Sequence, residues 1–170
     1  EIAEKIIVGV LAQENKYAVD THGTLVSSGG TAGYCIVSIP ADSQYSIYYI
    51  QAILGSIQGE WLASLYGEIF RGGFIARGTK VLKQIPICNI DFNNPADVAV
   101  HNEIVERQKL LISLGDRIAV AGNNARRATP LKRQFELLKA EQQQAINNLY
   151  GMTEEEVIII PKIKELYAAD

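Results

Sequence analysis

Two runs of apolar residues at helical spacing limit the possible folds more than any other feature of this sequence. Apolar residues recur every three or four positions over residues 100–125, which corresponds to about seven turns of helix. A second run covers residues 131–149 and contains one polar position, Gln142. Pro130 lies between the runs, and proline is favoured at the first position of a helix. Because two helices with a short connection pack antiparallel, the second half predicts a long helical pair.

The first half of the chain has a shorter hydrophobic period. Residues 5–11, 17–21 and 34–39 are rich in β-branched and aromatic side chains, which predicts three strands. Residues 43–66 return to helical spacing, with Asp42 or Ser43 able to cap the start and Gly67 placed at the end. Residues 69–88 again indicate extended structure, interrupted by glycines.

These patterns predict an α+β fold: a small twisted mixed or antiparallel sheet with a buried helix, followed by a long antiparallel helical pair. We expect an α/β subdomain over residues 1–92 and a helical hairpin, or docking region, over residues 93–170. Near the end of the chain, Thr153 and Glu156 have the spacing of a capping box. They predict one more short helical turn before Pro161.

Few residues suggest catalysis or metal binding. His22 and His101 are the only histidines, and neither lies in a catalytic motif, so we expect surface roles. Cys35 and Cys88 lie in apolar strand contexts, as buried free thiols do, and no zinc-binding spacing occurs. Residues 73–80 have the glycine spacing of a phosphate loop, but threonine precedes lysine and a helix is not expected next. We therefore expect no nucleotide site and no metal site.

Charge is distributed unevenly along the 170 residues, whose formal net charge is −3. Residues 61–90 contain four basic and one acidic side chain, and residues 126–140 contain five basic and one acidic. This charge balance excludes a protein that coats nucleic acid along its whole surface. It fits either a localised anion-binding face or an ordinary protein surface with charges of both signs. The sequence also begins at Glu1, and its only methionine is Met152, so we expect a piece of a larger protein.

Three stretches of the sequence together resemble the TaqI-type C-terminal specificity domain, the target-recognition domain of bacterial adenine-specific DNA methyltransferases and combined restriction–modification enzymes. Residues 48–62 (YYIQAILGSIQGEWL) are similar to the family's helix with a Leu-Asn-Ser step, although Gly55 stands in place of the asparagine. Residues 73–87 (GFIARGTKVLKQIPI) and residues 149–156 (LYGMTEEE) are similar to two further family segments.

This resemblance implies a DNA-binding domain that is not itself an enzyme. The parent would be a site-specific adenine methyltransferase of a bacterial restriction system, located in the cytoplasm, with or without DNA cleavage. Its separate catalytic domain would bind S-adenosylmethionine, so no cofactor is expected in this chain. The implied partners are double-stranded DNA, from which the target base must be flipped, and the catalytic domain of the same parent; no membrane partner is expected.

Residues 70–84 concentrate the side chains suited to DNA contacts. Arginine and glutamine read guanine and adenine edges, whereas lysine and hydroxyl groups suit phosphates. The expected base-reading residues are Arg71, Arg77 and Gln84. The expected phosphate contacts are Lys16, Ser27, Ser28, Thr31, Lys80 and Lys83.

Two alternatives to DNA reading stay open. Residues 70–84 could be a sheet edge that charge keeps soluble. The two helical stripes could also form a protein-interaction or oligomerisation module. A positive surface at residues 71–84 would favour DNA, whereas a wide exposed apolar face on the helices would favour oligomerisation.

Overall fold

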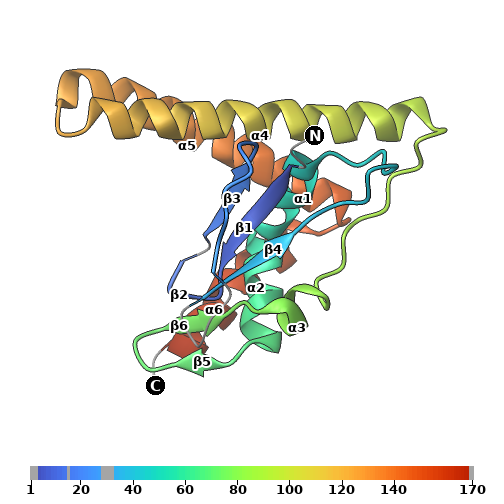
Figure 1. Cartoon of the computed structure of the whole chain (residues 1–170), viewed down its shortest axis with the longest axis horizontal. Helices are drawn as coiled ribbons and strands as arrows, with labels where there is room; N and C mark the ends of the chain where they lie inside the picture. Colours follow the sequence, from blue (N-terminus) through green and yellow to red (C-terminus); the bar gives the residue numbers. More distant parts are fainter. Residues whose placement is uncertain (1–3, 15, 28–32, 169–170) are drawn as a thin grey trace. The chain divides into compact units, whose positions relative to one another are not determined.

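The chain folds into two compact units, seen in a computed structural model that describes residues 4–14, 16–27 and 33–168, with side chains as far as residue 161. The first unit comprises Glu1–Cys88 and Met152–Asp170, and the second comprises Asn89–Gly151. Two small antiparallel sheets and six helices make up the described part, so the predicted α+β class is confirmed (Figure 1). The expected boundary grouped residues 93–170 together, whereas the contacts group the C-terminal helix with the first unit.

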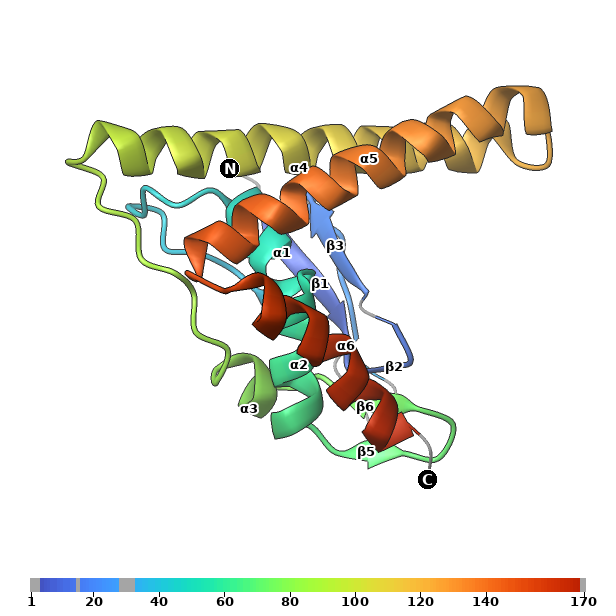
Figure 2. The same ribbon diagram turned by 180° about the vertical axis from the view of Figure 1, so that it is seen from behind.

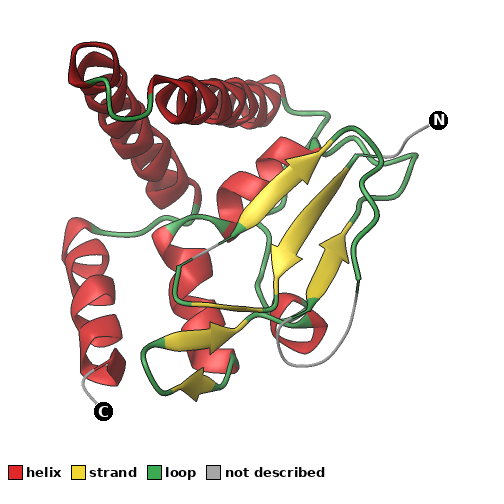
Figure 3. Cartoon of the chain, turned by 60° about the vertical axis from the view of Figure 1, so that its left-hand side comes forward, coloured by secondary structure: helices red, strands yellow, loops and turns green. Residues whose placement is uncertain are grey.

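The larger sheet has the strand order β3-β1-β4, with all pairs antiparallel. Its strands are β1 (Lys5–Gly9), β3 (Tyr17–Asp20) and β4 (Tyr34–Val37). Ile6 and Val8 alternate onto the buried face, where the sheet packs against helix α1 (Ile47–Leu54; Figure 3). The three strands predicted from the sequence are therefore present, with shorter bounds.

A second, smaller sheet has the order β2-β6-β5. It consists of β2 (Leu11–Ala12), β6 (Phe74–Ala76) and β5 (Ile69–Phe70). The predicted strand over residues 5–11 is thus divided at Val10 between two sheets. The amide of Val10 donates to the Gly33 carbonyl (3.0 Å), and its own carbonyl accepts from the Arg77 amide (2.6 Å).

The expected single helix over residues 43–66 is two helices, α1 (Ile47–Leu54) and α2 (Ile57–Tyr66). Ser46, rather than the expected Asp42 or Ser43, caps α1. Ser56 causes the break, because its hydroxyl donates to the Ile53 carbonyl (2.7 Å) and accepts from the Gly59 amide (3.1 Å), which starts a new helix. Extended structure was also expected throughout residues 69–88, but Thr79–Leu82 form the short helix α3.

An aspartate closes one end of the larger sheet. The Asp20 carboxylate pairs with the Lys5 ammonium (2.8 Å) and accepts bonds from the Thr24 amide (2.8 Å), the Thr24 hydroxyl (2.8 Å) and the His22 amide (3.1 Å). The bond from Lys5, followed by those from Thr24 and His22, holds the pKa of Asp20 well below its usual range. These bonds tie the start of β1 to the turn that follows β3.

Acid should weaken the fold through Asp20, and Asp20→Asn should remove that part of the pH dependence. Because the folded pKa is lowered, the carboxylate stabilises the fold above its unfolded pKa of about 3.9. That stabilisation is lost as the pH falls towards the folded pKa. Urea unfolding at pH 7 and at pH 3 measures it: the wild type should lose more stability than Asp20→Asn between these conditions. Equal losses would contradict the prediction.

The second unit contains the predicted helical pair, α4 (Pro95–Ala121) and α5 (Ala125–Leu149), side by side in Figures 1 and 2. Asn94 caps α4 by accepting from the Ala96 amide (3.0 Å), and Pro95 follows it at the start of the helix, where proline is favoured. The start of α5 was expected at Thr129-Pro130 but lies at Ala125, because Asn124 caps it first by accepting from the Arg127 amide (3.3 Å). Pro130 is therefore inside α5.

A buried polar layer crosses the helical pair at Gln142. The Gln142 amide nitrogen donates to the Ile104 carbonyl (2.9 Å) and lies 3.3 Å from the Gln108 amide oxygen. Its oxygen accepts from the Arg107 guanidinium (3.1 Å). All of these polar groups have partners in the observed alignment, so the layer favours this register of α4 against α5.

The last helix is α6 (Glu154–Ala168), which packs on α2. Its capping box forms as predicted, because the Thr153 amide donates to the Glu156 carboxylate (2.8 Å) and the Glu156 amide donates to the Thr153 hydroxyl (3.3 Å). The expectation of only a short turn before Pro161 is wrong, since the helix continues through that residue. None of the described helices has the length and apolar composition needed to cross a bilayer.

Candidate nucleic-acid interface

The β5–β6 hairpin places Arg71 at an exposed tip. Gly72 and Gly73 follow it with φ values of +86° and +74°, a conformation that favours glycine and allows the tight turn. The Gly73 amide donates to the Phe70 carbonyl (3.1 Å), which closes the turn. Phe70 and Phe74 face each other across the two strands and are 38% and 37% exposed. The tip thus combines a guanidinium with two accessible aromatic rings.

Helix α3 and the residues after it present a second exposed polar group. Lys80, Lys83 and Gln84 are all exposed. The Gln84 side-chain amide donates to the Lys80 carbonyl (3.0 Å), so one of its donors is used within the turn. Val81 and Ile85 are buried and hold the segment on the first unit. The two lysines are therefore carried by a segment with a fixed buried side.

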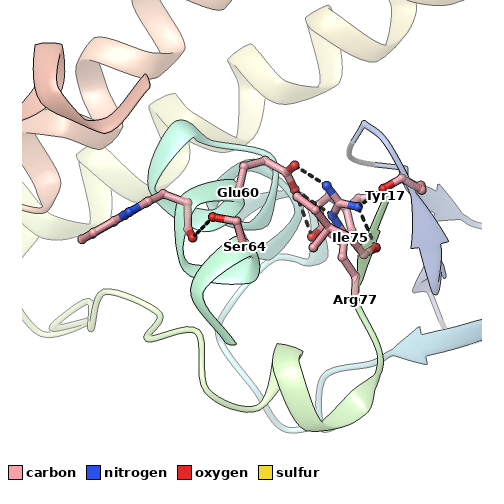
Figure 4. Close-up of polar contacts among 7 residues, drawn as sticks. Tyr17, Glu60, Ser64, Ile75 and Arg77 are labelled. Carbon is pink, nitrogen blue, oxygen red and sulfur yellow. Dashed lines mark hydrogen bonds and ion pairs between the residues drawn. The ribbon is translucent and has the colours of Figure 1, made fainter. Parts of the chain in front are cut away.

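Arg77 lies in the interior of the first unit, with no exposed surface. Its guanidinium binds the Glu60 carboxylate through two nitrogens, at 3.1 Å and 2.6 Å (Figure 4). A third nitrogen donates to the carbonyls of Ala12 (2.6 Å) and Ile75 (3.2 Å). An enclosed guanidinium with these partners cannot reach a base edge, so the expectation that Arg77 reads a base is corrected: it is a structural residue.

The Arg77–Glu60 pair joins four elements. It links β2 and β6 through the two carbonyls and α2 through Glu60, while the Tyr17 hydroxyl of β3 donates to the Glu60 carboxylate (3.4 Å). Burial, and then the negative charge of Glu60, raise the pKa of Tyr17 far above its usual value. This cluster connects both sheets to α2 and fixes the base of the β5–β6 hairpin.

The alternation of side chains along the strand could have predicted the structural role of Arg77. Ile75 and Arg77 are two residues apart in an extended segment, so their side chains point to the same face. Ile75 is buried, and Arg77 must follow it inward. Side-chain type alone does not distinguish Arg77 from Arg71, which lies in the turn between the two strands.

The remaining expected phosphate contacts lie elsewhere in the first unit. Lys16 is exposed just before β3, and its backbone carbonyl accepts from the Gly9 amide (3.2 Å). Ser27 is exposed in the connection between β3 and β4, and its carbonyl accepts from the Tyr34 amide (3.2 Å). Ser28 and Thr31 lie outside the described residues.

The residues with catalytic or metal-binding side chains are dispersed. No group of three or more histidine, cysteine or acidic residues within the described ranges could hold a metal ion. Cys35 and Cys88 are both half-buried, and burial raises the pKa of the Cys35 thiol. His22 is exposed as expected, whereas His101 is buried against Phe92 with ring centroids 5.3 Å apart. The surface role expected for His101 is therefore wrong.

The chain is similar to one stretch of a longer protein. It is 44% identical over 167 residues to the "Type II restriction enzyme and methyltransferase RM.Eco57I" of Escherichia coli. The aligned region covers 98% of this chain and 16% of that relative. No family model matches the chain, and no solved structure matches it. The chain is thus similar to a region of a restriction–modification enzyme and spans a small part of that enzyme's length.

Proposed function

We propose that this chain is the DNA target-recognition region of a bacterial restriction–modification enzyme. It would bind duplex DNA in the cytoplasm and direct N6 methylation of adenine by a separate catalytic domain of the same parent. The methyl donor, S-adenosylmethionine, belongs to that catalytic domain in this proposal. The similarity to a restriction–methyltransferase supports the restriction–modification role, and the TaqI-type sequence resemblance supports the assignment to target recognition.

The observation that carries the DNA-reading role is that the charged and amide side chains of residues 71–84 are exposed, with the exception of Arg77. Arg71 occupies the hairpin tip, while Lys80, Lys83 and Gln84 occupy α3 and the turn after it. All four side chains are exposed on one continuous segment, which the Arg77–Glu60 pair and buried apolar residues hold in place. A rigid support lets a short segment present its polar groups at fixed positions.

The roles proposed for the individual residues follow from their side-chain chemistry. Arg71 has a planar fork that can contact guanine N7 and O6 together, and Gln84 can contact adenine once its amide leaves the Lys80 carbonyl. Lys80, Lys83, Lys16 and Ser27 are assigned to phosphates, which set the position of the protein but carry no sequence information. Correct positioning would allow the catalytic domain to flip out the right adenine.

Substituting Arg71 tests the proposal. We expect Arg71→Ala to cost about 1–3 kcal/mol of discrimination at one base pair. The matched variant Arg71→Lys keeps the charge but loses the fork, so it should relax the sequence preference while retaining binding to DNA in general. Selection of bound sequences from a randomised duplex pool, at two salt concentrations, measures both effects.

Two results would contradict the proposal. If the wild-type chain bound no duplex at low salt, the DNA-reading role would be wrong. If both Arg71 variants kept the wild-type sequence preference, the assignment of Arg71 would be wrong while DNA reading itself stood. Circular dichroism and thermal unfolding of each variant provide the control, because Arg71 is exposed and its replacement should leave the fold unchanged.

A further inference from the structure

The turn between α4 and α5 carries a group of cations that the role proposed for residues 71–84 does not use. We call this group the basic tip. Its members are all exposed: Arg117, Arg126, Arg127, Lys132 and Arg133. Residues 117–135 contain these five basic side chains and no aspartate or glutamate. The end of the hairpin where α4 and α5 join, orange in Figure 1, therefore carries an excess of positive charge, with the exposed Asp116 directly before Arg117 and the exposed Glu136 three residues after Arg133.

Local helix electrostatics does not account for the basic tip. The N-terminus of a helix is positive, so acidic side chains stabilise its first turn and basic ones weaken it. Arg117, near the C-terminus of α4, is favourably placed. Arg126 and Arg127 instead occupy the first turn of α5, which contains no acidic residue. These two arginines are thus placed against the stability of their own helix.

The cations of the basic tip also differ in their ion pairing from the cations halfway along the α4–α5 hairpin. Arg107 pairs with Glu103, and Lys109 pairs with Glu106 at 2.8 Å. Within the described ranges, no ion pair joins any member of the basic tip to an acidic side chain. Arg126 and Arg133 are two helical turns apart and so lie on the same face of α5.

We propose that the basic tip binds the phosphate backbone of duplex DNA, as a contact separate from the base-reading segment. This inference rests on the proposed DNA-binding function and adds a second site on the second unit. Duplex DNA presents regularly spaced negative charges, which exposed arginines on one helix face can contact without reading sequence. The affinity from such contacts falls steeply as salt rises, because bound cations are released from the DNA.

The test compares two double variants of the full chain. Arg126→Gln/Arg127→Gln removes two charges at the basic tip, and Lys109→Gln/Lys139→Gln removes two charges at a level about 20 Å along the helices from the turn. Binding to a duplex of fixed sequence is measured by fluorescence anisotropy between 50 and about 200 mM salt. Thermal unfolding of each variant is measured in parallel.

The tip variant should bind roughly 10- to 100-fold more weakly near 0.1 M salt, with a salt dependence shallower by about two phosphate contacts. Its melting temperature should be equal to or above that of the wild type, because the first turn of α5 loses unfavourable charge. The control variant should retain the wild-type salt slope. This combination separates a DNA contact from a structural role.

A tip variant with the wild-type affinity and salt slope would overturn the inference while leaving the proposed function standing. Equal losses in the tip and control variants would also overturn it, because they would show a general effect of net charge. If the wild-type chain bound no duplex at 50 mM salt, the proposed function and this inference would both fail. If the wild type bound DNA and Arg71→Ala changed its sequence preference, while the tip variant bound as the wild type does, only this inference would fail.

Discussion

Replacing Arg77 by alanine is expected to lower the free energy of unfolding by about 3–5 kcal/mol, the cost of removing one partner from a buried ion pair. The Glu60 carboxylate would stay buried beside Tyr17 without its main counter-charge. The carbonyls of Ala12 and Ile75 would also lose their guanidinium donor. Because the cluster joins both sheets to α2, the whole first unit should be affected.

Urea unfolding followed by circular dichroism measures this effect, with Arg71→Ala as the matched control. Arg71 is exposed at the hairpin tip, so its replacement should change stability by less than about 0.5 kcal/mol. Equal stability changes in the two variants would contradict the structural role of Arg77. A loss of DNA binding in Arg77→Ala would report a damaged fold and would not identify a base contact.

Replacing Gly59 by alanine is expected to destabilise the first unit by about 3 kcal/mol, as overpacking does in a dense core. A Cβ atom on Gly59 would lie 2.5 Å from the Ile53 carbonyl oxygen and 2.5 Å from that of Leu54. Both atoms belong to the backbone of α1, which cannot rotate away as a side chain would. The helices α1 and α2 would have to separate at their junction.

Gly115 provides the matched control for Gly59, because it also lies within a helix but its added Cβ would meet no atom within 4 Å. We expect Gly115→Ala to stabilise the chain by about 0.5–1 kcal/mol, since alanine loses less conformational freedom than glycine on folding. Thermal unfolding of both variants gives the comparison. A Gly59→Ala protein as stable as the wild type would contradict the close packing of α1 and α2.

The helical half of the fold could be predicted from the sequence because its stabilising contacts repeat with the helical period. The apolar stripes on α4 and α5 face each other, and the caps at Asn94 and Thr153 follow local rules. Exposed apolar residues do remain on these helices, chiefly Leu110, Val120 and Leu137.

The predictions that differ from the structure depend on contacts between distant parts of the chain or on competing local caps. Ser56 interrupts an otherwise continuous helical pattern by binding backbone groups on both sides of the break. Arg77 has the same chemistry as Arg71, but it follows the buried Ile75 inward, and its pairing with Glu60, 17 residues away, satisfies its charge in the interior. Composition identified a basic segment, but burial decides which of its members face solvent.

The polar layer at Gln142 gives the α4–α5 hairpin a preferred alignment, which an entirely apolar interface between the two helices would lack. In the observed alignment the Gln142 side chain binds Ile104 and Arg107 of α4, so its buried polar atoms are satisfied and this alignment is favoured. The 27 residues of α4 then span a set length of about 40 Å. That length equals the rise of about twelve base pairs of B-form DNA. The hairpin therefore holds its two ends at a constant separation.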